Sequence, residues 1–82
     1  MADLKEIRKQ INQIDKEMAK LFEERMKASS EVAEYKKQHA LPIFDSSREQ
    51  EVINNNLNFI KDENLRDYYV NFLQYTMDIS KK

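Results

Sequence analysis

Apolar residues recur along the first half of the chain at alternating spacings of three and four. The series comprises Leu4, Ile7, Ile11, Ile14, Met18, Leu21, Arg25, Ala28, Val32 and Tyr35. Such spacing is a heptad seam, which aligns its members along one face of an α-helix. Asp3 and Glu6 resemble a capping box, and Pro42 disfavours helix in the residue before it. The pattern predicts one helix of roughly 35 residues from near residue 4, about 50 Å long.

Two shorter helical patterns follow Pro42. The first runs from Ser46 or Ser47 to about Lys61, with apolar Val52, Ile53, Leu57 and Ile60. The second runs from about Leu65 to Ser80 and carries one stripe of Leu65, Tyr69, Phe72, Thr76 and Ile79, and another of Val70, Leu73 and Met77. Glycine is absent and Pro42 is the only proline, so the tight turns of a β-sheet have almost no sequence support. An all-α fold of three helices is predicted, one long and two short.

The predicted long helix is too long for a compact monomer of this size. A globule of 82 residues would have a radius of gyration of about 12 Å, and hence a diameter of roughly 30 Å. One small domain spanning residues 1–82 also buries only about 60% of its unfolded surface. We therefore expect an intertwined homodimer, a helical bundle in which two long helices pair and the short helices cover both.

Composition narrows the possible partners. The chain has 14 basic and 15 acidic residues, a net charge of −1, which gives no general reason to expect nucleic acid or an anionic membrane. There is no cysteine, so neither disulfides nor a Cys-based zinc site is expected, and the single His39 has no partner at metal-ligand spacing. No signal peptide or membrane span is recognisable, so the expected location is the cytoplasm.

Arg25 is the anomaly of the seam, because a guanidinium there must lose its hydration or meet an anion. Lys36 lies 11 residues further on, within about 20° of the same helix face, so both cations could converge on one anion. Two alternatives remain open. Arg25 could instead fix the register of helix pairing, and Lys36 could simply favour the helix dipole and reach into water.

Two further positions, Arg8 and Gln74, and one short stretch add candidate chemistry. Arg8 is 17 residues before Arg25, about 25 Å away, so it could reach the same ligand only from an antiparallel partner chain; otherwise it is a solvated arginine. Gln74 lies beside Val70 and Met77, where its amide is either a neutral donor or a partner for backbone groups. The stretch "DSSRE" predicts a capping box of Ser46 with Glu49, assisted by Asp45.

The same stretch has a functional interpretation, because an arginine held beside two carboxylates suits a ligand that carries both carboxylates and a hydroxyl. Four segments together, "IRKQINQID", "ERMKASSEVAEYK", "PIFDSSRE" and "FLQ", resemble the all-helical class of chorismate mutases over nearly the whole chain. The motif residues that match are Arg8, Arg25, Lys36, Asp45, Arg48, Glu49 and Gln74.

The resemblance implies rearrangement of chorismate to prephenate by an interlocked homodimer, with no cofactor or metal. Arg8 of one chain and Arg25 of the other would hold the substrate carboxylates, while Lys36 and Gln74 donate to the ether oxygen. Asp45 and Glu49 would orient the ring hydroxyl, and Arg48 would help form the cationic wall. The sequence departs from some relatives at Val70, where they carry a small hydroxyl residue that contacts a carboxylate.

Two other functions compete with this interpretation. The isochorismate pyruvate lyases share the fold, but lack the Asp-Arg-Glu pattern seen in "DSSRE". A non-catalytic helical dimer, acting as an adaptor, would use Arg25 only for pairing, so replacing Arg25 by alanine would be neutral or stabilising.

Overall fold

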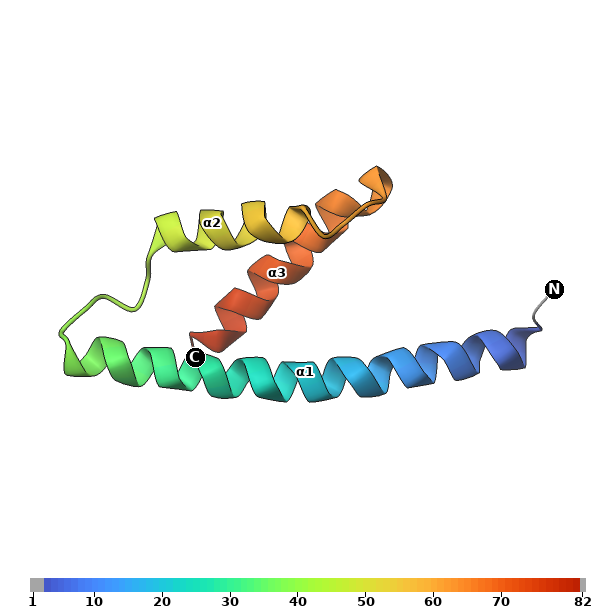
Figure 1. Ribbon diagram of the computed structural model, residues 1–82, viewed down its shortest axis with the longest axis horizontal. Coiled ribbons are helices and arrows are strands. Elements are labelled where there is room, and N and C mark those ends of the chain that lie inside the picture. Colours follow the sequence, from blue (N-terminus) through green and yellow to red (C-terminus); the bar gives the residue numbers. More distant parts are fainter. Residues whose placement is uncertain (1–2, 82) are drawn as a thin grey trace.

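The computed structural model describes residues 3–81 and consists of helices (Figure 1). The elements are α1 (Leu4–Gln38), α2 (Ser46–Leu57), the 3₁₀-helix η1 (Glu63–Leu65) and α3 (Arg66–Ser80). Residues 3–81 contain no strand. The predicted all-α fold of one long and two shorter helices is confirmed.

Both ends of α1 lie where the sequence signals place them. The Asp3 side chain accepts a hydrogen bond from the backbone N–H of Glu6 at 2.9 Å, which pairs an amide left free by the first helical turn. At the other end Ala40 adopts φ 53°, in the left-handed region, and the N–H of Leu41 donates to the Lys36 carbonyl at 2.8 Å. This closure of the last turn is usually made by glycine, which this chain lacks.

Helix α2 begins at Ser46, as predicted, but its capping residue and its last residue differ from the prediction. The capping side chain is Asp45, which accepts from the backbone N–H of Arg48 at 3.1 Å, so the predicted cap at Ser46 was wrong by one position. The helix ends at Leu57 rather than near Lys61. At that end the Arg66 guanidinium donates to the carbonyl of Leu57 at 3.2 Å and of Ile60 at 3.5 Å, which pairs backbone oxygens that the helix leaves free.

The short helices return the chain to the carboxyl-terminal half of α1. In Figure 1, α3 runs diagonally from the end of α2 so that its own end lies beside α1. The only buried side chains of residues 3–81 belong to α3, namely Leu73 and Met77. The contact with α1 is partly polar, since Arg25 donates to the Ser80 hydroxyl at 3.2 Å. This contact brings the end of α3 against the second half of α1, near the start of α2.

The rest of α1 extends away from the other helices, so the molecule is elongated (Figure 1). Its extents are 56 × 25 × 17 Å and its radius of gyration is 16.1 Å, compared with about 12 Å for a compact chain of this length. No described residue of α1 is buried, and the seam members Ile14 and Leu21 are 56% and 58% exposed. No helix in the described part of the chain is long and apolar enough to cross a membrane.

Candidate active site

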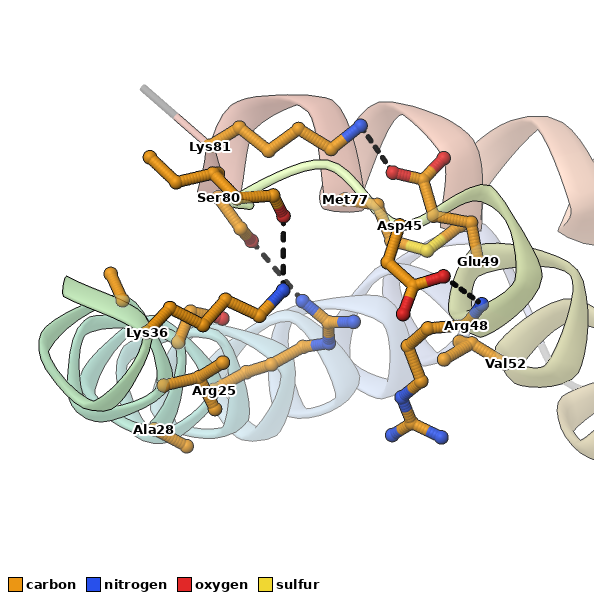
Figure 2. Close-up of a pocket in the computed structure, with 14 residues that line it drawn as sticks. Arg25, Ala28, Lys36, Asp45, Arg48, Glu49, Val52, Met77, Ser80 and Lys81 are labelled. Atoms are coloured by element: carbon orange, nitrogen blue, oxygen red, sulfur yellow. Dashed lines mark hydrogen bonds and ion pairs between the residues drawn. The ribbon is translucent and has the colours of Figure 1, made fainter. Parts of the chain in front are cut away.

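A solvent-open pocket of about 320 Å³ lies where the three helices meet (Figure 2). Its walls come from the second half of α1, the loop before α2, the first turns of α2 and the end of α3. The lining residues are Arg25, Ala28, Ser29, Val32, Ala33, Lys36, Ile43, Asp45, Arg48, Glu49, Val52, Met77, Ser80 and Lys81. Five of the seven residues predicted for the site are among them.

Arg25 and Lys36 form the cationic side of the pocket, on α1. Both are partly buried. The Arg25 guanidinium donates to the Ser80 hydroxyl and the Lys36 ammonium to the Ile43 carbonyl at 3.0 Å, and both of these acceptors are neutral oxygens. Within residues 3–81 neither is in an ion pair. The predicted convergence of the two cations on one cavity is therefore present, and their charges are not neutralised by these contacts.

Asp45 and Arg48 come from the start of α2. The Asp45 carboxylate is partly committed, because it caps the helix through the backbone N–H of Arg48. The Arg48 guanidinium pairs with Glu51 on the same helix and points away from Asp45 and Glu49 in Figure 2. With its side chain 61% exposed, Arg48 contributes its stem to the wall more than its charge.

Glu49 is the most enclosed acid of the site, with a side chain only 16% exposed. One carboxylate oxygen forms an ion pair with Lys81, and the other accepts from the Gln74 amide at 3.2 Å. The pKa of Glu49 lies below its ordinary value, chiefly because Lys81 bonds to the carboxylate, with Gln74 assisting and burial opposing. The same contact with Glu49 raises the pKa of Lys81. Glu49 is thus held as a carboxylate.

Gln74 lies behind Glu49 and does not line the pocket. Its amide nitrogen donates to Glu49 and to Asp78, the latter at 3.0 Å. Val70, one turn earlier, is also outside the lining. The structure therefore joins Gln74 to the site through Glu49, and its expected contact with a substrate oxygen stays a prediction.

Arg8 is the predicted residue that the single chain keeps apart. It belongs to the amino-terminal half of α1, 17 residues before Arg25, which corresponds to about 25 Å along the helix. In Figure 1 that half extends away from the junction of the three helices. Within one chain Arg8 and Arg25 do not share a cavity.

Two lining residues at the end of α3 escaped the sequence interpretation. Ser80 bonds to Arg25, and Lys81 bonds to Glu49. The signal was available, because the stripe through Leu73 and Met77 reaches positions 80 and 81 at the next helical step.

The charges of the lining define what the pocket suits. The lining includes four cationic side chains, from Arg25, Lys36, Arg48 and Lys81, and two carboxylates, from Asp45 and Glu49. Because Arg48 is paired with Glu51 and Lys81 with Glu49, the two cations left without an ion-pair partner among residues 3–81 are Arg25 and Lys36, and these favour a small anionic ligand. Across residues 3–81, no group of three histidine or acidic side chains could hold a metal ion.

The sequence is similar to one known protein family and to several named proteins. The family described as chorismate mutase type II matches residues 7–82. A protein named chorismate mutase, from Methanocaldococcus jannaschii, is 39% identical over 76% of this chain and 63% of its own length. A bifunctional chorismate mutase/prephenate dehydratase from Aquifex aeolicus is 42% identical over 63% of this chain and 14% of that protein.

A third relative, the T-protein of Haemophilus influenzae, is 41% identical over 60% of this chain and 13% of its own length. The chain thus spans less than two thirds of the length of each of these relatives, and only a small part of two of them. No solved structure matches the chain at a comparable level.

Proposed function

The chain belongs to the chorismate mutase type II family, and on that basis we propose that it converts chorismate to prephenate. The observation that carries the proposal is the pair of cations on α1, Arg25 and Lys36, which face one pocket without an ion-pair partner among residues 3–81. Chorismate has two carboxylates, and an arginine can bind a carboxylate through two parallel hydrogen bonds. The positive charges of Arg25 and Lys36 complement that dianion.

The reaction is an intramolecular rearrangement, so the site must select a reactive conformation and stabilise charge on the ether oxygen as the C–O bond breaks. In the proposed arrangement Arg25 binds a carboxylate and the Lys36 ammonium donates to the ether oxygen. Asp45 and Glu49 accept from the ring hydroxyl. Arg48 supports the wall, and Gln74 acts at least through its hydrogen bond to Glu49. No covalent intermediate with a side chain is required.

The functional unit is, in this proposal, a homodimer of the single domain 1–82, in which Arg8 of each chain reaches the pocket of the other. The support is the exposed seam on the amino-terminal half of α1, where Leu4, Ile11 and Ile14 are at least half exposed. An apolar stripe of that length is normally covered in solution. An antiparallel partner helix would cover it and would carry Arg8 toward the second cation pair.

The direct test is prephenate formation by the purified chain supplied with chorismate. Prephenate should form without added metal or cofactor, at a rate well above that of the same solution without protein. A parallel reaction with isochorismate distinguishes the lyase of the same fold, because that activity releases pyruvate. Pyruvate release exceeding prephenate formation, or no turnover of either substrate, would reject the proposal.

A further inference from the structure

Lys81 occupies an unusual place at the rim of the pocket. It follows the last residue of α3, and its ammonium forms an ion pair with Glu49 of α2. The same ammonium lies 3.7 Å from an oxygen of Asp78 and 4.6 Å from the centre of the Phe44 ring. Lys81 therefore joins the end of α3 to both the start of α2 and the loop before it.

The Glu49 carboxylate, which Lys81 contacts, is unfavourable for anion binding in this pocket. Glu49 is mostly enclosed and carries a negative charge where a dianion would have to bind. Like charges repel strongly at short range in a partly desolvated site. Glu49 can help to bind an anion only if a nearby cation offsets its charge.

We propose that Lys81 is a positioning residue that neutralises Glu49 and so allows the pocket to accept a dianionic substrate. The inference rests on the function proposed above, and it assigns Lys81 a role through Glu49 rather than through direct contact with the substrate. Its ammonium is already directed to Glu49, as Figure 2 shows. Arg25 and Lys36 then do not have to pair with Glu49 and remain able to bind the ligand.

The ion pair also orients the Glu49 carboxylate. Lys81 holds one oxygen and Gln74 donates to the other, so the group is fixed from two sides. A carboxylate oxygen accepts more than one hydrogen bond, which leaves capacity for a substrate hydroxyl. Removing Lys81 would therefore leave the negative charge of Glu49 without its cation. It would also let the Glu49 carboxylate, which is proposed to orient the substrate, move more freely.

Other ionisable groups around Glu49 do not replace Lys81. The Arg48 guanidinium is turned to Glu51, and the Asp78 carboxylate adds negative charge. The ionisable groups that line the pocket with Glu49 or act on it are Asp45, Arg48, Arg25, Lys36, Asp78 and Lys81. Of the four cations in that set, only Lys81 is paired with Glu49. Titration of Glu49 should thus depend on Lys81 above all.

The first experiment needs no substrate. The Glu49 carboxyl carbon is followed by NMR from acid to neutral pH in the wild type and in the Lys81→Met and Lys81→Arg variants. The midpoint should rise in Lys81→Met and stay near the wild-type value in Lys81→Arg. Lys61→Met is the matched control, since Lys61 is exposed and is not among the residues that line the pocket. A midpoint unchanged by Lys81→Met would overturn the proposal.

The second experiment measures chorismate turnover against pH. At neutral pH the KM of Lys81→Met should rise by about tenfold to a hundredfold, because an unneutralised carboxylate then repels the substrate. Its kcat/KM should recover in part as acid protonates Glu49, whereas Lys81→Arg should follow the wild type. In a Glu49→Gln background, Lys81→Met should cause little additional rise in KM.

The outcomes separate the two proposals. An equal loss at every pH, present also in the Glu49→Gln background, would mean that Lys81 acts directly or only structurally, and would overturn its assignment. A wild-type chain that does not convert chorismate would reject the proposed function, and with it the catalytic meaning of Lys81. The NMR titration would still decide whether Lys81 neutralises Glu49.

Discussion

The two halves of α1 carry the same heptad pattern and have different surroundings. The carboxyl-terminal half, residues 25–36, faces α3 and contributes Arg25 and Lys36 to the pocket. The amino-terminal half, residues 4–22, exposes its apolar seam, and in Figure 1 it extends beyond the other helices. A sequence repeat therefore specifies which face of a helix is to be covered, and not which chain covers it.

That difference divides the proposed site between the halves. Arg25 lies in the half that contacts α3 of the same chain and lines the pocket, although its seam members Val32 and Tyr35 stay 53% and 56% exposed. Arg8 lies in the half that extends beyond the other helices (Figure 1). If a partner covers the exposed half, the same interaction supplies the missing arginine. Changes in the amino-terminal half should then abolish both dimer formation and catalysis. Changes at the pocket residues of the carboxyl-terminal half should abolish catalysis and leave the dimer intact.

The largest effect is expected from Ile14→Asp, in the exposed half. A carboxylate placed in the centre of an apolar interface costs several kcal/mol unless it is paired. Dimers and chorismate turnover should therefore be lost together, as measured by sedimentation and by prephenate formation. Gln13→Asp is the control, because Gln13 lies on another face of the helix. Intact, fully active dimers of Ile14→Asp would show that the seam is not the interface.

Arg25→Ala, in the other half, should remove activity and leave assembly intact. Loss of a charge-assisted contact in such a site typically lowers kcat/KM by about a hundredfold to a thousandfold. Helical circular dichroism and dimer mass should stay unchanged, with exposed Lys27→Ala as the control for loss of a cation. An adaptor without catalysis makes the opposite prediction, since replacing its buried charge should be neutral or stabilising.

The two aspartate caps provide a smaller, matched comparison. Asp3→Ala and Asp45→Ala should each lower the free energy of unfolding by about 1 kcal/mol, measured in urea, because each removes a bond to a free backbone amide. Only Asp45→Ala should also reduce turnover, since Asp45 lines the pocket. Equal effects of both variants on kcat/KM would mean that Asp45 acts only as a cap.

The smallest effect concerns the pH dependence of stability. Glu49 has a lowered pKa when folded, so its ion pair stabilises above the ordinary value near 4.5 and is lost as the pH falls through the folded pKa. Lys81 has a raised pKa, so its contribution is complete below 10.5 and is lost at higher pH. The difference in unfolding free energy between wild type and Lys81→Met should therefore be greatest between about pH 5 and pH 10. A constant difference across that range and into acid would contradict this coupling.

Much of the fold could be predicted because its signals are local. Asp3, Pro42 and the heptad spacing fixed α1 without any knowledge of packing. The end of α2 could not be predicted in this way, because no local signal marks it and the carbonyl of its last residue, Leu57, is paired by Arg66, nine residues later. Local rules also could not choose between Ser46 and Asp45 as the cap, since both have suitable side chains.

The site was predictable to the extent that it lies on one helix. Helix geometry alone places Lys36 on nearly the same face of α1 as Arg25, and both residues line the pocket. The contribution of α3 depends on how that helix rotates against α1 and α2. That rotation turned Ser80 and Lys81 into the lining and left Gln74 behind Glu49, which a stripe of apolar residues cannot specify.

The central claim, that each site takes Arg8 from one chain and Arg25 from the other, is tested most directly by mixing two inactive variants. Arg8→Ala and Arg25→Ala chains are combined in equal amounts under conditions of verified subunit exchange. Half of the dimers should then be mixed, and one of the two sites in each mixed dimer should have both arginines, so activity should recover to about a quarter of the wild-type value. Activity that remains at the level of the separate variants would contradict the shared site.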